Sequence, residues 1–167
     1  MQPTSHRGLN RRQTLICTAA AGLAAVFAPL ALAAEPPINT LKNSLFGGRT
    51  GTAINGYDTV AYFTQGKPVK GLDTLAFDWM GAIWKFSTQA HLDLFRASPE
   101  KYAPQYGGYC AYGVAQDNLV KVEPDQFTVR DGKLYLNYDA EVQSRWKKDP
   151  DGFIRAADAK FQALLKK

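Results

Sequence analysis

The fold class is decided by residues 127–138, which read Phe127-Thr128-Val129-Arg130-Asp131-Gly132-Lys133-Leu134-Tyr135-Leu136-Asn137-Tyr138. Aromatic and branched side chains alternate with polar ones on both sides of the Asp-Gly pair, as expected for two half-buried strands. Asp-Gly also supplies the positive φ angles that a tight hairpin turn needs. The stretch therefore predicts a β-hairpin.

A second hairpin is expected earlier in the chain. Residues 75–79 and 83–86 flank Gly81-Ala82, and both segments show the alternation of half-buried strands. The turn has only one glycine, so its signal is weaker than that of Asp-Gly. Together the two segments predict that the chain contains two antiparallel hairpins.

Helices are expected between and after the hairpins. Ser87 or Thr88 can cap a central helix that follows the first hairpin, and Pro99 stops it. Residues 139–148 and 152–165 have the apolar spacing of two closing helices. Strands and helices do not alternate as parallel βαβ units, and we see no internal repeat. The expected class is a small single α+β domain.

The chain begins with a segment typical of a secretory signal peptide. Arg7, Arg11 and Arg12 precede an uncharged, Ala- and Leu-rich run over residues 14–32, which ends in a small-x-small pattern at Ala33. An uncleaved membrane anchor is the alternative, because the run approaches the length that spans a bilayer. Gly and Pro in the run and the cleavage pattern favour a signal peptide over residues 1–33, cleaved near Ala33, and no stable membrane insertion afterwards.

The paired arginines favour one export route. Arg11-Arg12 followed by Leu15 resembles the twin-arginine motif, although Thr14 and Ile16 depart from it. A twin-arginine signal exports a protein that is already folded. We therefore expect a periplasmic protein that is exported by the twin-arginine route. Export by the general route is the alternative.

Residues 34–53 have the composition of a flexible linker. Pro36-Pro37 is followed by the glycine-rich stretch 47–51, which lacks the lysine and the spacing of a phosphate-binding loop. The linker is expected to precede the folded domain at 54–167, where Asp58 can cap a short helical turn.

The charge balance excludes some classes of partner. Removing residues 1–33 takes away three arginines and no acid, which leaves 20 − 3 = 17 basic and 15 acidic residues, a net charge of +2. That value gives no case for nucleic-acid binding. The sequence also lacks the motifs of serine hydrolases, zinc proteases, dithiol oxidoreductases and dinucleotide-binding enzymes, so no catalytic residue is assigned.

Cysteine usage singles out one residue. Cys17 leaves with the signal peptide, so Cys110 is the only cysteine of the expected mature chain and has no internal disulfide partner. Its thiol can be buried and inert, pair between molecules, bind a metal or react. Gly107-Gly108 allow the backbone to approach a neighbour closely, and nearby tyrosines can shape the surroundings of the sulfur: Tyr102, Tyr106, Tyr109 and Tyr112.

Several of these motifs resemble the YHS domain family. One motif combines an aromatic strand, a Cys or Ser, a ligand-like residue four positions later and then Phe, continuing to Pro99 and Tyr102: Trp84-Lys85-Phe86-Ser87-Thr88-Gln89-Ala90-His91-Leu92-Asp93-Leu94-Phe95. Residues 55–63 and 102–113 are similar to the longer exported branch of that family. The resemblance covers residues 54–155.

The resemblance implies chemistry at two positions. Metal-binding members carry Cys-x₃-Cys where this chain has Ser87 and His91. A serine hydroxyl is a weak ligand, whereas a neutral imidazole suits copper or zinc. Some members of the longer branch have selenocysteine in place of the cysteine after Gly-Gly-Tyr, which implies a functional sulfur at Cys110. The resemblance thus implies a soft-metal site, most plausibly for copper, with Cys110 and His91 as ligands.

Three functional hypotheses follow. The first is metal handling through Cys110 and His91, and the second is thiol redox chemistry at Cys110 with an external thiol as partner. The third is a non-catalytic partner-binding module in which Cys110 only packs, a common fate of free cysteines. His91, the only histidine of the mature chain, can likewise be a packing residue.

Overall fold

The computed structural model describes residues 35–41 and 48–167. They belong to one compact unit, Leu32–Lys167. The expected signal peptide and residues 34 and 42–47 of the expected linker lie outside the described residues. Within the described part of the chain, no helix has the length and hydropathy that a membrane span requires.

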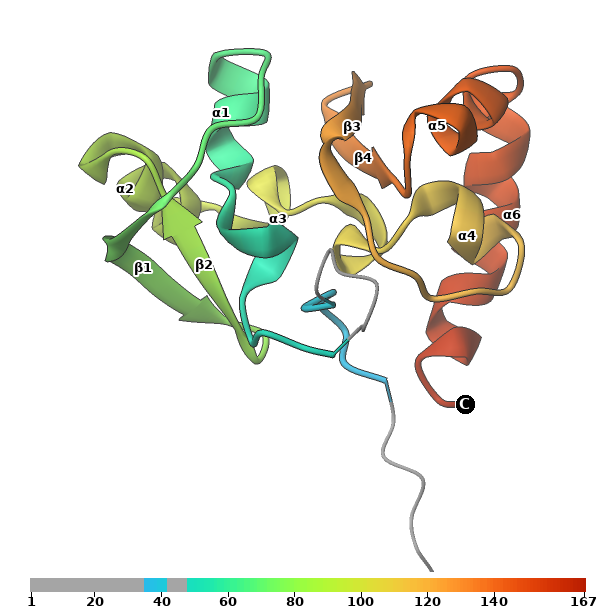
Figure 1. Ribbon diagram of the computed structural model, residues 1–167, viewed down its shortest axis with the longest axis horizontal. Coiled ribbons are helices and arrows are strands. Elements are labelled where there is room, and N and C mark those ends of the chain that lie inside the picture. Colours follow the sequence, from blue (N-terminus) through green and yellow to red (C-terminus); the bar gives the residue numbers. More distant parts are fainter. Residues whose placement is uncertain (1–34, 42–47) are drawn as a thin grey trace, which may run out of the picture. The chain divides into compact units, whose positions relative to one another are not determined.

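The described residues form short helices and two separate antiparallel hairpins (Figure 1). In chain order the elements are η1 (Ala53–Gly56), α1 (Thr59–Thr64), β1 (Leu72–Trp79), β2 (Ala82–Phe86), α2 (Gln89–Ala97), α3 (Pro99–Tyr102), η2 (Gln105–Gly108), α4 (Ala111–Ala115), β3 (Glu123–Arg130), β4 (Lys133–Asn137), α5 (Ala140–Trp146) and α6 (Pro150–Leu164). The expected α+β class and both hairpins are confirmed.

The hairpin turns follow the expected chemistry, with one shift. Asp131 and Gly132 have φ angles of 51° and 71°, as a primed turn requires. The first hairpin turns at Met80 and Gly81, with φ angles of 50° and 75°, one residue earlier than the expected Gly81-Ala82. β1 ends at Trp79, as expected, but β2 begins at Ala82, one residue before the expected 83, so the two-residue turn falls on Met80 and Gly81.

The expected bounds of the central helix are confirmed, whereas α5 ends two residues before the expected 148 and α6 begins two residues before the expected 152. Thr88 caps α2 by accepting a hydrogen bond from the backbone N–H of His91 at 3.2 Å. Pro99 follows the end of α2 and also opens α3, where a proline without an N–H is tolerated in the first turn. Asp139 and Asp149 cap α5 and α6 in the same manner.

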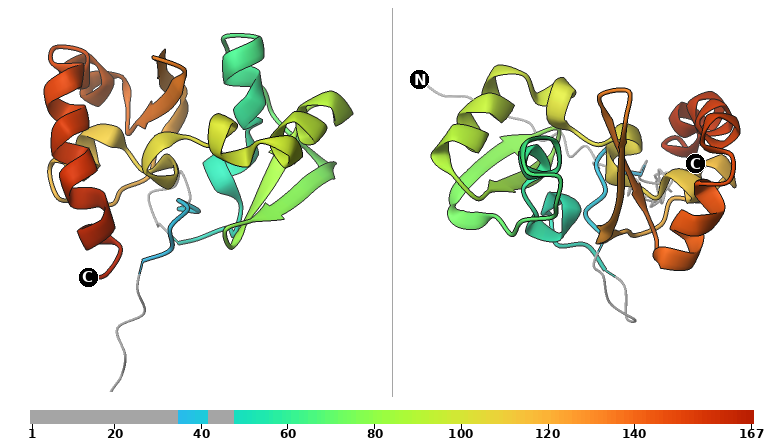
Figure 2. Two further views of the ribbon diagram at one scale, coloured as in Figure 1. Left: turned by 180° about the vertical axis from the view of Figure 1, so that it is seen from behind. Right: turned by 90° about the horizontal axis from the view of Figure 1, so that it is seen from above.

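Two clusters of buried side chains make the core. One contains Trp84, Phe86 and Phe95, with the ring centroids of Trp84 and Phe95 5.0 Å apart. The other contains Tyr109 and Trp146, on which the apolar stripe of α6 packs. Figures 1 and 2 show α2 beside the β1–β2 hairpin, and α4, α5 and α6 gathered beyond the β3–β4 hairpin.

The described elements form an internal repeat that the sequence analysis missed. A 3₁₀ turn, a short helix, a hairpin and two helices occur in the first repeat (Ala53–Tyr102, η1 to α3) and again in the second repeat (Gln105–Leu164, η2 to α6). Both hairpins carry a register irregularity in their first strand, between Leu72 and Ala76 and between Glu123 and Phe127. The expectation of no repeat was therefore wrong.

The 3₁₀ turns give the closest match between the repeats. Three successive residues are left-handed in each turn, with similar φ angles: Ile54 48°, Asn55 52° and Gly56 79° in η1, and Tyr106 55°, Gly107 59° and Gly108 83° in η2. The residue after each turn then donates a backbone hydrogen bond of 3.0 Å to its first left-handed residue, Tyr57 to Ile54 and Tyr109 to Tyr106. Such angles are costly outside glycine, so their recurrence supports the repeat.

Residues 36–41 differ from the flexible linker expected over 34–53. Ile38 and Asn39 are 3% and 4% exposed. Asn39 donates its backbone N–H to the Gly107 carbonyl at 2.9 Å and its side-chain amide to the Gly108 carbonyl at 3.0 Å. This segment, residues 36–41, is called the strap below. It packs on η2 because Asn39 and the η2 carbonyls satisfy each other's hydrogen-bonding groups.

Candidate functional site

Asp58 lies at the centre of the first repeat and is fully buried. Its Oδ1 caps α1 by accepting the backbone N–H groups of Val60 at 2.9 Å and Ala61 at 3.3 Å. Its Oδ2 accepts the backbone N–H of Ser87 at 2.8 Å and the Ser87 hydroxyl at 2.6 Å. This cradle of donors joins α1 to the end of β2.

His91 completes this cradle. Its Nδ1 lies 2.6 Å from Asp58 Oδ2, and its Nε2 lies 3.1 Å from the hydroxyl of Thr64 at the end of α1. The imidazole is thus held at both nitrogens, and the ring is nearly buried, with a side-chain exposure of 10%. Ser87 and His91, expected as possible metal-site residues, are here hydrogen-bonding partners of a carboxylate.

Cys110 lies in the second repeat and is 1% exposed. It is the N-cap residue of α4, and its Sγ accepts the backbone N–H of Gly113 at 3.3 Å. The side-chain amide of the fully buried Asn137 points to the same sulfur at 4.0 Å. The backbone N–H groups of Tyr112 and Tyr138 also act on it. The sulfur therefore faces several N–H donors.

Cys110 is the counterpart of Asp58. Each residue follows a left-handed turn and caps the short helix after it. Each also faces the backbone N–H of the residue directly after its hairpin, Ser87 for Asp58 and Tyr138 for Cys110, which are 51 residues apart (138 − 87). Each also donates its own backbone N–H to a valine carbonyl, Val69 or Val120. The same cradle thus holds a carboxylate in one repeat and a thiol in the other.

The two cradles share backbone partners but differ in their side-chain partners. The position of His91, three residues after the N-cap of α2, is occupied in the second repeat by Val142, three residues after the N-cap of α5. Val142 packs against the hydrophobic core. A carboxylate at position 110 would lack the imidazole that accompanies Asp58, and a buried charge without a partner is costly. A cysteine can stay neutral there and still accept the cap hydrogen bond.

The pKa of Cys110 agrees with this interpretation. Burial raises the pKa of the thiol above its ordinary value of 9.0, and the surrounding N–H donors, led by that of Gly113, oppose the rise without cancelling it. The uncharged thiol is therefore the stable form in the folded protein at neutral pH. A thiolate is the nucleophilic and metal-binding form, so the enclosed sulfur is poorly placed for either chemistry.

We expect the alkylation of Cys110 by iodoacetamide to be slow at pH 7 and to rise with pH through and beyond 9.0, because the reactive thiolate forms only above the raised pKa. The measurement uses a chain carrying Cys17→Ser, in which Cys110 is the only cysteine. The same chain unfolded in urea should react faster at every pH. Its alkylation rate should stop rising once the pH exceeds the ordinary pKa of a cysteine. Rapid labelling of the folded chain at pH 7 would show instead an accessible, acidic thiol.

The expected tyrosines and glycines occupy different places around Cys110. Tyr109 is buried, and its hydroxyl donates to the Pro36 carbonyl of the strap at 3.1 Å. Tyr112 packs against Phe153 of α6, with ring centroids 5.0 Å apart. A Cβ on Gly107 would lie 1.8 Å from the Pro37 carbonyl oxygen, so this glycine allows the close approach of the strap.

The structure does not bring Cys110 and His91 together. The hydrogen bonds of His91 go to Asp58, Ser87, Thr64 and Thr88, and those of Cys110 to Gly113 and Asn137. Figures 1 and 2 show α2, which carries His91, and α4, which follows Cys110, on opposite sides of the described chain. Among the described residues, no cluster of three or more His, Cys, Asp or Glu side chains could hold a metal ion. Cys110 and His91 therefore have separate sets of hydrogen-bonding partners, and copper binding stays a prediction.

An open groove lies between the two repeats. It has a volume of about 360 Å³ and is lined by residues from the end of β1, the α3–η2 segment and α6: Trp79, Glu100, Ala103, Pro104, Gln105, Tyr106, Asp158, Phe161 and Gln162. We call it the seam groove. Its volume is within the range of small-molecule sites, roughly 300–1,000 Å³, and ligand sites often lie between structural units.

Aromatic rings and carboxylates line the seam groove together. The ring centroids of Tyr106 and Phe161 are 5.7 Å apart in an edge-to-face contact. The Tyr106 hydroxyl donates to Asp158 Oδ1 at 2.9 Å and is 3.3 Å from the Ile154 carbonyl. Burial, with the hydrogen bond to Asp158 as the next cause, raises the pKa of Tyr106, so this hydroxyl stays a donor. None of the described residues that line the groove is basic.

Sequence reasoning missed most of these residues. Asp58 was interpreted only as a cap, and Tyr106 only as a neighbour of Cys110. Trp79 was considered only as the last residue of an expected strand and Phe161 only as part of the expected helix over 152–165, and Asp158 was not singled out. The left-handed turn of η2, which places Tyr106 in the groove, had one signal in the sequence, the pair Gly107-Gly108.

Comparison with known proteins adds no assignment: no family model, no curated protein and no solved structure matches this chain.

Proposed function

We propose that this protein is an exported binding module without a catalytic centre of its own, and that the seam groove is its ligand-contacting surface. One observation carries the proposal: aromatic and acidic side chains of both repeats line one open groove of about 360 Å³. The arrangement has the general character of a small-molecule site, which combines apolar walls with a few polar groups.

Cys110 and His91, the two residues expected to bind a metal or to react, have structural roles that support this proposal. Cys110 caps α4 as a neutral thiol, and His91 is held by Asp58 and Thr64. Both act as parts of the scaffold of their repeat. The hypotheses of copper handling and of thiol redox chemistry, and the resemblance to the YHS domain family, stay predictions.

Binding at the seam groove can be followed through tryptophan. The chain has three tryptophans, of which Trp79 lines the groove and Trp146 is fully buried. We expect at least one of three probes (benzyl alcohol, benzylammonium and benzoate) to shift the ¹⁵N-labelled indole signal of Trp79 in a saturable way, because organic ligands displace water from an aromatic surface.

Trp146 is the internal control, and its indole signal should not shift. Trp84 is not a clean control, because its indole N–H donates to the Trp79 carbonyl at 3.1 Å. A Trp79 signal that no probe shifts, or that shifts only together with Trp146, would argue against the groove as a binding surface.

A further inference from the structure

We infer that the seam groove takes an organic cation with a methylated, quaternary nitrogen, of the chemical class to which choline belongs. This inference rests on the proposed function, because it names the ligand class of the same groove. It is carried by the combination of aromatic side chains, carboxylates and the absence of any basic residue among the described residues that line the groove.

The aromatic part of the groove suits a diffuse positive charge. Trp79, Tyr106 and Phe161 come from three separate elements and line one space. The face of an aromatic ring attracts a cation, most strongly in tryptophan, and clusters of such rings recognise quaternary ammonium groups. Trp79 is also fixed in place, with its ring centroid 5.7 Å from those of Trp84 and Phe95. A fixed ring loses little freedom when a ligand binds.

The carboxylates select for charge. Glu100 and Asp158 line the groove from opposite repeats, one from α3 and one from α6. The nearest lysine on α6, Lys160, is turned to another partner: its Nζ lies 2.7 Å from Asp117 Oδ2 and 2.8 Å from the Ala115 carbonyl. An anion would therefore meet two like charges in the groove, whereas a cation would meet two opposite ones.

The apolar walls of the groove suit the methyl groups of a quaternary nitrogen. A primary ammonium carries three N–H donors and needs acceptors for them. One of the carboxylate oxygens of Asp158 already accepts the Tyr106 hydroxyl, and the remaining walls include Ala103 and Pro104, which offer apolar surface. A quaternary ammonium group has no N–H to satisfy, and its methyl groups can pack on rings and apolar walls.

The test compares choline with 3,3-dimethyl-1-butanol, its neutral isostere, by calorimetric titration of the purified protein. We expect choline to bind about tenfold more tightly, as a desolvated cation–π contact and two carboxylates together imply. Asp158→Asn, which keeps an acceptor for Tyr106, and Glu100→Gln should each weaken choline binding severalfold and leave the isostere unchanged.

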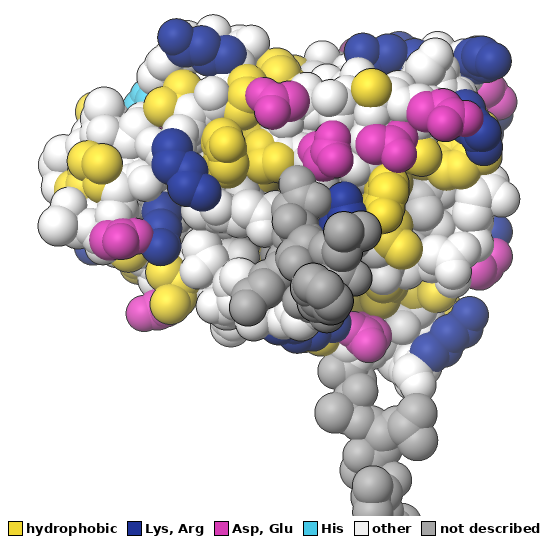
Figure 3. Space-filling model, viewed as in Figure 1, with side chains coloured by type: hydrophobic (Ala, Val, Ile, Leu, Met, Phe, Trp, Pro, Cys, Tyr) yellow, Lys and Arg dark blue, Asp and Glu magenta, His cyan; other side chains and the backbone are white. Residues whose placement is uncertain are grey.

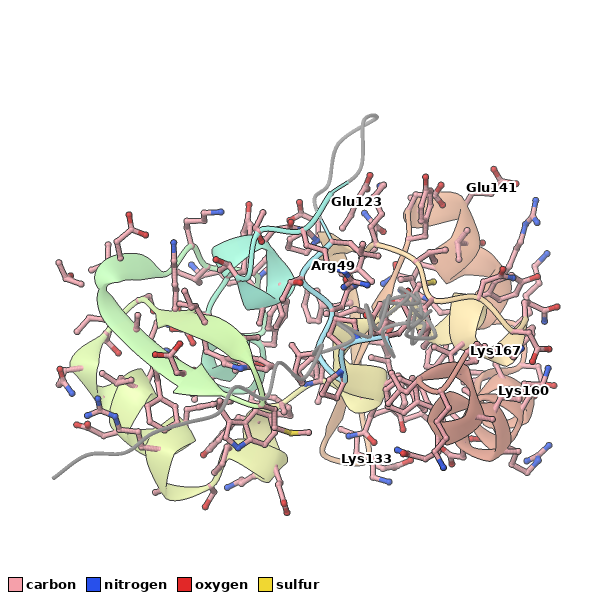
Figure 4. The ribbon with its side chains drawn as sticks, turned by 90° about the horizontal axis from the view of Figure 1, so that it is seen from below. Arg49, Glu123, Lys133, Glu141, Lys160 and Lys167 are labelled. Carbon is pink, nitrogen blue, oxygen red and sulfur yellow. The ribbon has the colours of Figure 1, made fainter. Side chains whose placement is uncertain are left out.

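Glu141→Gln is the matched control. Glu141 is an exposed acid on α5 (Figure 4), and it does not line the groove. Its removal changes the net charge by the same amount and should leave both affinities unchanged. Equal affinity of choline and its isostere, or equal weakening by Glu141→Gln and Asp158→Asn, would overturn the inference while the groove remains a binding surface. If neither probe binds and the Trp79 signal also fails to respond to the benzyl probes, the proposed function falls with it.

Discussion

Asp58→Ala is expected to lower the free energy of unfolding by about 3–5 kcal/mol, the usual cost of removing one partner from a buried pair. The substitution removes the side-chain acceptor that five donors of the cradle share: the backbone N–H groups of Val60, Ala61 and Ser87, the Ser87 hydroxyl and His91 Nδ1. Because small domains are stable by only about 5–15 kcal/mol, the loss would be evident in urea unfolding.

Two further variants make this prediction specific. Asp58→Asn keeps an acceptor oxygen for the cap and should lose less stability than Asp58→Ala. Asp73→Ala removes another aspartate, one that pairs with Lys85 at the surface with a side-chain exposure of 88%, and should change stability little. If Asp58→Ala cost no more than Asp73→Ala, the cradle would not hold the first repeat together.

Gly107→Ala is the second substitution with a large expected effect, about 2–5 kcal/mol. Gly107 is left-handed, with φ at 59°, which costs an alanine roughly 1–2 kcal/mol. The added Cβ would also lie 1.8 Å from the Pro37 carbonyl oxygen, and relieving such overpacking typically costs about 1–3 kcal/mol more. We expect the strap to leave η2, and hydrogen exchange should show lost protection at the Asn39 amide.

Gly132→Ala separates the two contributions. Gly132 is also left-handed, with φ at 71°, but a Cβ there would meet nothing within 4 Å. Gly132→Ala should therefore lose only the stability that a left-handed backbone costs an alanine. The Asn39 amide should keep its protection from hydrogen exchange. Equal losses in the two variants would mean that the strap contributes nothing to stability. The position of Arg49 fits a docked strap: it pairs with Leu41 across an isolated β-bridge and lies beside this segment in Figure 4.

Much of the fold could be predicted because local signals decide it. Asp131-Gly132 specified its turn, and Thr88 specified the start of α2 through a cap that needs only neighbouring residues. The cap at Asp149 was not recognised, and α6 begins at Pro150, two residues before the expected 152. The turn at Met80 could not be placed, because a left-handed methionine is unfavourable and its neighbours in the hairpin impose it.

The repeat was hidden because the matching positions of its two cradles hold different residues. Asp58 corresponds to Cys110, His91 to Val142 and Ser87 to Tyr138, so equal backbone geometry is built from unlike side chains. The strap was hidden for a related reason. Its proline-rich composition is typical of a linker, and the acceptors that bind Asn39 lie about 70 residues further along the chain.

The candidate site was the part least accessible from the sequence. Cys110 and His91 stand out by their chemistry, yet each is engaged within its own repeat. The seam groove consists of common residues that only the packing of α6 and the η2 turn bring near Trp79. The surface in Figure 3 does not mark the seam groove by charge either: Lys and Arg side chains are scattered, and the Asp and Glu side chains that gather do so near β3 and α5, which do not line the groove.

The most direct test of the central claim is the affinity for choline of Cys110→Ser and Asp158→Asn, measured side by side by calorimetry on folded protein. If the seam groove is the functional surface and Cys110 is a neutral cap, Cys110→Ser will bind choline as the unchanged protein does, and Asp158→Asn will bind it severalfold more weakly. Lost binding in Cys110→Ser together with full binding in Asp158→Asn would contradict this account. It would show that ligand binding depends on the Cys110 sulfur and not on the seam groove.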